Sequence, residues 1–477
     1  MYFFPYFLIL FSLYVSKPDY ELTEERIKIM NDFIKSQMKL AKVDTLGLIV
    51  TNKSKTIYQN IYGDNTKVSS TTPFVIGSVS KSFTALGLLK LNIPLNDTLD
   101  KYKLSNYIKE EDSKKITVGE LLNHSSGLIS FGSKVINENK GNLSYSNYGY
   151  ALLGKIIEEK SGKTYNEYMK EAIFNPLKMN DTEAIYRDNI VDSYDTFFGF
   201  NTKYTGLESE IGDGFYVPAG FVSSSIEDMG KYLRLYLNKD SEDYKKYISQ
   251  MIKGSINYMY NEDYGLGMFV KKKNGQTVYY HPGGTNSFSS YLYVYPSQEL
   301  GIFIILNSNN MFCLTPVQQL FNNIENFIAF DTFDTINSTL FLYVHFSLDV
   351  IFIIVIAIPL IYLIITIVRK CQKKKFTWFI GCKGITIFII ELILLILLPI
   401  MVIIFLYTFD ADIRYALNNT RDLKFTVFTA CSALILTFLI KLIYSLVFNK
   451  YFKSIGGDSS KKIEAMDLDY MGVEEDK

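Results

Sequence analysis

Three long apolar runs near the C-terminus constrain the fold of this chain more than any other feature. They cover residues 350–368, 385–407 and 425–448, and each is about 19 to 24 residues long. At a rise of about 1.5 Å per residue, a helix of that length crosses the roughly 30 Å of hydrocarbon in a bilayer. The sequence therefore predicts three transmembrane helices within residues 340–448 and a separate, more polar domain before them.

The charges beside these runs predict which side of the membrane the polar domain faces. Clusters of Lys and Arg follow the first and the last run, and the positive-inside rule places both clusters in the cytoplasm. With three spans, residues 17–335 then lie outside, and the polar tail 449–477 is cytoplasmic. We expect a multi-pass membrane protein, with the lipid bilayer as a partner and an extracellular or lumenal domain.

The first sixteen residues are apolar but too short to span a bilayer, and polar sequence follows them directly. We interpret residues 1–16 as a signal peptide, which agrees with an outward-facing domain. An uncleaved N-terminal anchor is the alternative, because the segment has no basic start and no A-x-A cleavage site.

Composition excludes several classes of function. The 49 Lys and Arg residues balance 49 Asp and Glu residues, so the chain lacks the basic surplus typical of proteins that bind nucleic acid. The three histidines stand singly, and no HxH, HExxH or CxxC motif supplies the ligands of a zinc site. We therefore expect no metal and no nucleic acid partner, and chemistry that uses oxygen and nitrogen nucleophiles.

The outer domain is predicted to mix helices and strands. Residues 23–41 carry one apolar stripe and a capping threonine, which predicts an amphipathic helix. Two short runs, 46–51 and 56–62, are predicted to form a β-hairpin, and a second strand-rich stretch covers 276–306. A mainly helical middle separates them. Strands at both ends of the domain predict one antiparallel sheet whose first and last strands meet, in the α+β class.

A serine and a lysine stand three residues apart at the start of an apolar helical segment. Residues i and i+3 share one face of a helix, so the Ser78 hydroxyl and the Lys81 ammonium are expected to be neighbours. A lysine in a pocket can take the proton from a serine or tune its reactivity, and amides at a helix N-terminus can stabilise an oxyanion. The spacing alone is weak evidence, because two other Ser-x-x-Lys pairs occur in the chain.

A second polar stretch lies just before another predicted helix, residues 148–160, and contains Tyr145 and Asn147. A tyrosine hydroxyl can act as a base near neutral pH only beside a cation, which Lys81 could supply. Asn147 could donate to a substrate carbonyl or hold the lysine. The Tyr-x-Asn pattern also occurs elsewhere in the chain, so it is not specific by itself.

A third stretch contains His281, Gly283 and Gly284 and opens a strand-rich region. Paired glycines let the backbone approach a ligand closely, and the Gly284 amide could donate to an oxyanion beside the amide of Ser78. Taken alone, the stretch could equally be a glycine turn with an exposed histidine that has no role in a site.

Taken in order, these three stretches resemble the serine β-lactamase and penicillin-binding-protein family, within it the class C β-lactamase and related esterase branch. The resemblance covers about residues 25–325. Its other motifs are Leu121–Leu128 (LLNHSSGL), Tyr145–Gly154 (YSNYGYALLG), Phe174–Met179 (FNPLKM) and Pro218–Met229 (PAGFVSSSIEDM). The resemblance implies a five-stranded antiparallel sheet beside a helical subdomain, with the active site in the cleft between them and no metal or organic cofactor.

The resemblance also implies roles for single residues. Ser78 would be the acylated nucleophile, Lys81 its partner and Tyr145 the proton shuttle. Asn147 would bind substrate, and the backbone amides of Ser78 and Gly284 would form the oxyanion hole.

The chain departs from this family at one position that matters for substrate choice. Many β-lactamases and peptidases carry K-T-G where this chain has His281, Pro282 and Gly283. A lysine there supplies a cation for a substrate carboxylate, whereas a histidine is mostly neutral at pH 7. This difference argues against recognition of penicillins or peptide C-termini, although His281, Gly283 and Gly284 are still expected to line the substrate site.

Two functions follow from these observations. The leading hypothesis is a membrane-anchored, outward-facing serine hydrolase that acts through an acyl-enzyme on an ester, amide or peptide bond of a small molecule or peptide. The alternative is a catalytically silent domain that uses the same cleft for binding or scaffolding. Ser78, Lys81 and Tyr145 together favour the hydrolase, because a pure binding protein needs no nucleophile paired with a base.

Overall fold

The computed structural model describes residues 21–63, 66–197, 200–309 and 314–334, with helical residues within 350–368 and 425–443. The chain divides into two compact units, Met1–Tyr343 and Val344–Lys477. The first unit contains the sheet and the helices described below.

The predicted membrane segments fall largely outside this description. The predicted signal peptide 1–16, the predicted span 385–407 and the tail 449–477 lie outside the described residues, as do parts of the other two predicted spans. Among the residues that are described, no helix combines the length and the apolarity that crossing a membrane requires.

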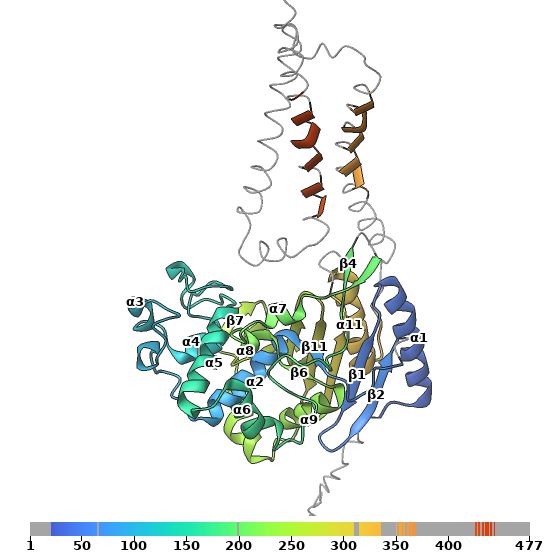
Figure 1. The fold of residues 1–477 in the computed structure, drawn as a ribbon. Helices are drawn as coiled ribbons and strands as arrows, with labels where there is room; N and C mark the ends of the chain where they lie inside the picture. The colour runs from blue at the N-terminus through green and yellow to red at the C-terminus, as the bar shows by residue number, and fades with distance from the viewer. Residues whose placement is uncertain are drawn as a thin grey trace, which may run out of the picture. The chain divides into compact units, whose positions relative to one another are not determined.

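An antiparallel sheet organises the first unit and has eight strands within the described residues (Figure 1). Their order across the sheet is β2-β1-β12-β11-β10-β9-β8-β7. The strands are β1 (Leu46–Thr51), β2 (Thr56–Tyr62), β7 (Ile256–Met259), β8 (Glu262–Tyr264), β9 (Phe269–Lys273), β10 (Gln276–Gly284), β11 (Ser289–Tyr295) and β12 (Leu300–Leu306). β1 pairs with β12, with Leu46 opposite Leu306, so the prediction that the first and last strands meet is confirmed.

The strand number implied by the resemblance is wrong, because eight strands are described where five were expected. β7, β8 and β9 come from residues 256–273, which the sequence assigned to the helical middle. These strands are short, lie at the edge of the sheet and carry lysines and asparagines, which have low strand propensity. Their best local signal is Asn274-Gly275, where both residues have positive φ in the tight turn between β9 and β10.

Helices pack on both faces of this sheet (Figure 1). Two further pairs of short strands form separate two-stranded sheets. The helices are α1 (Glu24–Leu40), α2 (Ser80–Lys90), α3 (Glu110–Ser113), α4 (Val118–Leu122), α5 (Asn147–Ser161), α6 (Tyr165–Met169), α7 (Leu207–Ile211), α8 (Val217–Gly220), α9 (Ile226–Leu237), α10 (Ser249–Met251) and α11 (Leu314–Phe330). The small pairs join β3 (Phe74–Val75) to β6 (Ser223–Ser224) and β4 (Tyr194–Phe197) to β5 (Phe200–Lys203). The α+β class is therefore confirmed, as is the predicted helix over residues 23–41.

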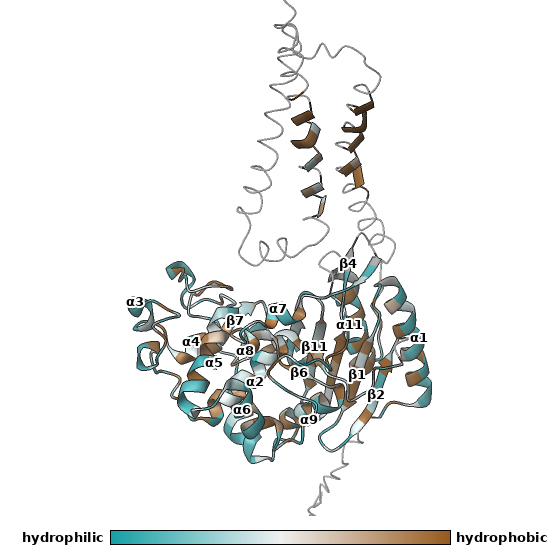
Figure 2. Ribbon diagram, viewed as in Figure 1, coloured by the Kyte–Doolittle hydropathy of each residue, from teal (hydrophilic) through white to brown (hydrophobic). Residues whose placement is uncertain are grey.

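Both faces of the central part of the sheet are covered, so every residue of β1 and β12 is buried. On β12, Phe303 and Ile305 pack into a cluster with α2 and α9, while Ile302 and Ile304 pack into a second cluster with α1 and α11. Successive side chains of a strand point to opposite faces, so β12 contributes side chains to both clusters. Figure 2 shows the hydrophobic residues concentrated on these strands and hydrophilic residues along α1.

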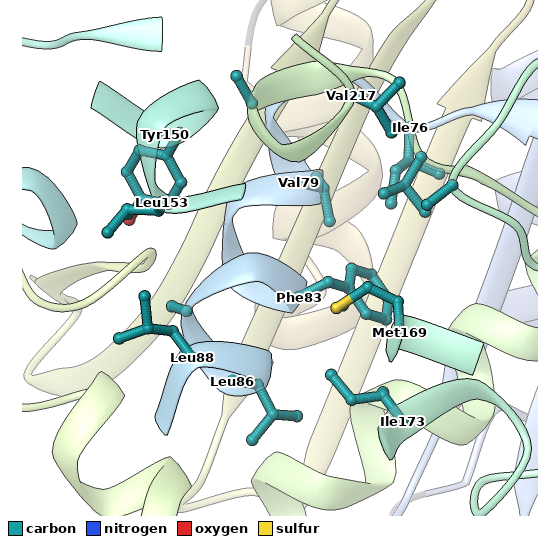
Figure 3. Packing of buried hydrophobic residues seen from close by; sticks show 14 of the residues in the cluster. Ile76, Val79, Phe83, Leu86, Leu88, Tyr150, Leu153, Met169, Ile173 and Val217 are labelled. Atoms are coloured by element: carbon teal, nitrogen blue, oxygen red, sulfur yellow. The ribbon is translucent and has the colours of Figure 1, made fainter. Parts of the chain in front are cut away.

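Helix α2 lies inside the first cluster, and every residue from Ser80 to Leu89 is buried. Other elements therefore enclose this helix on all sides, including its polar residues Ser80, Lys81 and Ser82. Figure 3 shows Phe83 and Leu86 of α2 beside Met169 and Ile173 from the following helical segments. The chain thus holds the start of α2, with Lys81, in the interior of the domain.

The burial of α1 on the sheet predicts the stability of two neighbouring variants. Ile34 is fully buried, whereas Lys35 is exposed on the other side of the same helix. We expect Ile34→Ala to lower the free energy of unfolding by about 2–5 kcal/mol, because it leaves a cavity, and Lys35→Ala to change it by less than about 0.5 kcal/mol. Urea unfolding of both variants, monitored by near-ultraviolet circular dichroism of the tyrosines, tests this. Equal unfolding midpoints would contradict the packing of α1.

Candidate active site

Ser78 lies in a 3-10 turn, Gly77–Val79, that leads directly into α2. The turn begins at Gly77, whose φ of 58° favours glycine, and the Ser80 hydroxyl fixes it by donating to the Gly77 carbonyl at 2.7 Å. The Ser78 side chain is partly exposed while its neighbours in the turn are buried. The local fold therefore presents one hydroxyl at the surface of an otherwise buried segment.

The Lys81 ammonium lies directly beneath this hydroxyl. Its Nζ donates to Ser78 Oγ at 3.0 Å, to Asn147 Oδ1 at 2.7 Å and to the backbone carbonyl of Ala219 at 2.6 Å. The residue has no exposed surface. Three acceptors match the three N–H bonds of an ammonium group, which offsets the large cost of burying a charge.

The segment before α5 brings Tyr145 and Asn147 to the same place. Ser146 caps α5 by accepting from the amide of Gly149, and Asn147 also donates to Ser130 Oγ at 3.1 Å. Lys81 Nζ lies 4.7 Å from the centroid of the Tyr145 ring, a distance that permits a cation–π interaction. Tyr145 and Asn147 are partly exposed, so both can face a ligand above the buried lysine.

The end of β10 closes the other side of the site through contacts between backbones. A Cβ atom on Gly77 would lie 2.3 Å from the nitrogen of Gly284, and one on Gly283 would lie 2.2 Å from the carbonyl oxygen of Ile76. Any side chain at these positions would therefore force the two segments apart. The glycines place the Gly284 amide beside the turn that carries Ser78, as an oxyanion site requires.

His281 is not on the open surface of the site. Its ring has no exposed area; Nε2 lies 3.1 Å from the Tyr264 hydroxyl, and Nδ1 lies 2.7 Å from the Pro282 carbonyl. Burial, together with the nearby Lys81 ammonium, lowers the pKa of His281 to about 3. The ring is therefore neutral at pH 7, with Nδ1 donating to the carbonyl and Nε2 accepting from Tyr264.

His124, which lies in the Leu121–Leu128 motif, is also fully buried. Its Nδ1 accepts from the amide of Ser146 at 3.0 Å, and its ring lies 4.2 Å from that of Tyr145. Burial and the Lys81 charge lower the pKa of His124 well below its ordinary value. The histidine thus supports the loop that carries Tyr145.

Three groups of the site were missed from the sequence. The Ala219 carbonyl lies in the Pro218–Met229 motif, but a backbone acceptor leaves no signal in side-chain patterns. Ser130, which accepts from Asn147, follows the Leu121–Leu128 motif by two residues and was not singled out. Tyr264 ends β8 and could have been found only by predicting that strand. Burial raises the pKa of its hydroxyl, which therefore stays protonated and donates to His281.

Comparison with known proteins identifies related chains. The family model described as Beta-lactamase matches residues 30–313. Protein flp of Staphylococcus aureus strain MW2 is 25% identical over 353 residues, which cover 65% of this chain and 69% of that protein. Beta-lactamase-like protein 4 of Dictyostelium discoideum is 29% identical over 268 residues, which cover 46% and 47% of the two chains.

A solved structure also matches. The octameric penicillin-binding protein homologue from Pyrococcus abyssi is 25% identical to this chain and superposes with a TM-score of 0.53. The match covers 63% of this chain and 80% of that one. It therefore supports the fold of the first unit.

The burial of His281 predicts how stability depends on pH. The unfolded chain binds a proton at this ring below about pH 6.5, whereas the folded chain does so only near pH 3. The free energy of unfolding should thus fall as pH drops from 6.5 towards 3, by up to about 1.4 kcal/mol per pH unit from this residue. We expect His281→Gln to reduce this slope in urea unfolding measured from pH 7 to pH 4, and a His281 ring that titrates near pH 6.5 in NMR spectra would contradict the assignment.

Proposed function

Because this chain belongs to the Beta-lactamase family, we propose that it is a serine hydrolase that forms an acyl-enzyme on Ser78. The observation that supports this proposal best is the contact of 3.0 Å between the Lys81 ammonium and the Ser78 hydroxyl, inside a site that also holds Tyr145 and Asn147. A binding protein has no need of a partly exposed hydroxyl above a buried cation.

The proposed reaction begins when the Ser78 oxygen attacks the carbonyl carbon of the substrate. Its proton passes to the ionised hydroxyl of Tyr145, because the Lys81 ammonium has no lone pair to receive a proton. The Lys81 charge stabilises the tyrosine anion electrostatically, as its position near the ring allows. The amides of Ser78 and Gly284 hold the developing oxyanion.

The intermediate collapses when the bond to the leaving group breaks and Tyr145 returns the proton to that group. Water then attacks the Ser78 ester by the same route and releases the acid product, which regenerates the enzyme. Asn147 orients the carbonyl end of the substrate while it holds Lys81. Since His281 is neutral and buried, we infer substrates that do not depend on a cation at this position, in the class of esters, amides and peptides.

The nucleophile assignment predicts the outcome of one substitution. Ser78→Ala should lower turnover of an activated ester by at least about 10³-fold and abolish the covalent adduct, because the covalent route is lost while little packing is removed. Intact-mass measurement after exposure to 4-nitrophenyl acetate, and separately to a penicillin, tests this and compares the two classes of substrate.

Ser36→Ala is the matched control, because Ser36 and Lys39 have the same spacing on the exposed side of α1. It should retain both adduct and turnover. Folded wild-type protein that gives neither adduct nor turnover with either reagent would instead favour a binding domain.

We also propose that residues 340–448 tether this domain to a membrane and that the domain faces outward. The support is the length and apolarity of runs 350–368, 385–407 and 425–448, together with the basic residues that follow the first and last of them. An odd number of spans agrees with the apolar segment at residues 1–16. The bilayer is then the partner of the C-terminal unit.

This proposal predicts behaviour in extraction experiments. The full chain should remain with membranes at pH 11, because burial of three apolar helices in lipid resists alkali, whereas a chain ending at residue 334 should enter the supernatant. Sedimentation after carbonate treatment provides the measurement. Release of the full chain under these conditions would exclude the tether.

A further inference from the structure

A carboxyl group lies beside the site, next to the turn that follows β10. Glu210 belongs to α7, and the Asn286 side-chain amide donates to its Oε1. Asn286 follows Gly284 by two residues, so the two lie within about 7 Å of each other along the chain. α7 also precedes α8, whose Ala219 carbonyl binds Lys81, so Glu210 is joined to the site through both segments.

One oxygen of this carboxyl group lacks a donor. Oε2 of Glu210 is buried and has no hydrogen-bond partner within the described part of the chain, although Tyr204 supports the carboxyl group. A buried acceptor without a donor is costly, so a ligand that brings an N–H bond gains what the protein does not supply. Burial chiefly, and the nearby Asp195 charge, raise the pKa of Glu210 to about 7, while the Tyr204 hydrogen bond opposes them.

The charges around the site favour a cationic ligand group at this place. The Lys81 ammonium is enclosed by its three acceptors, and the buried His281 ring is neutral. Neither residue therefore supplies a cation for a substrate carboxylate, whereas Glu210 offers a carboxyl group that is bonded to Asn286, two residues after Gly284. A substrate anion would be repelled from this side, and an ammonium group would be attracted.

We propose that Glu210 is a specificity residue that binds the ammonium group of an amine-bearing substrate. Asn286 and Tyr204 hold the carboxyl group, and its Oε2 accepts the N–H bond of the ligand. The inference rests on the hydrolase proposed above and names its class of substrate. No bond is made or broken at Glu210, which acts in binding alone.

The first experiment compares two esters that differ only in a terminal amine, 4-(2-aminoethyl)phenyl acetate and 4-propylphenyl acetate, with the full chain in detergent. We expect wild-type kcat/KM to favour the amine by about tenfold, as a charge-assisted hydrogen bond allows, and Glu210→Gln to bring the ratio close to one. Glu208→Gln is the matched control, because it removes the same charge from an exposed position of the same helix and should keep the preference.

The second experiment measures binding without turnover. In calorimetry, the Ser78→Ala chain should bind 2-phenylethylamine more tightly than 2-phenylethanol. Adding Glu210→Gln to this chain should remove the difference in affinity. Because the bound ammonium favours the ionised carboxyl group, affinity for the amine should increase as pH rises from 6 to 8.

The outcomes separate this inference from the hydrolase proposal. Turnover that depends on Ser78, with the same amine preference in wild type and Glu210→Gln, would overturn the inference alone. Amine binding that depends on Glu210 in a chain without turnover would support the inference and overturn the hydrolase. If the chain shows no turnover and no amine binding, both proposals are overturned.

Discussion

The buried ammonium of Lys81 is the interaction on which the arrangement of this domain depends. An unpaired charge in the interior costs several kcal/mol, and this one is stable because it donates to Ser78, Asn147 and the Ala219 carbonyl. These acceptors belong to the start of α2, to α5 and to α8, which are far apart in the sequence. The helices must pack together before the charge is satisfied, so assembly of the site and folding of the helical part are one event.

A second constraint joins the helical part to the sheet. The turn that carries Ser78 approaches the end of β10 so closely that neither Gly77 nor Gly283 has room for a Cβ atom. Ser290 on β11 adds a hydrogen bond to the Ile76 carbonyl at 2.8 Å, which holds the two backbones together. The position of the Gly284 amide therefore follows from backbone contacts, whatever side chains line the cleft.

These contacts explain what could be predicted from the sequence. The neighbouring Ser78 and Lys81 follow from helical spacing, and the pairing of β1 with β12 follows from apolar runs at both ends of the domain. The burial of His281 could not be foreseen, because it depends on contact with Tyr264, which belongs to β8, a short strand with weak local signals. The Ala219 carbonyl was equally hidden, since a backbone acceptor is chosen by tertiary geometry.

The same lysine also limits which charges the site can hold. A second cation buried near Lys81 would raise the energy of both. Burial chiefly, and repulsion by the Lys81 ammonium in addition, lower the pKa values of His124 and His281. His124 and His281 therefore stay neutral beside the Lys81 ammonium. We expect a ligand cation to bind beside a carboxyl group such as Glu210, as proposed above, and not beside the Lys81 ammonium, which would repel it. The electrostatics of the core thus determine where a charged substrate can be recognised.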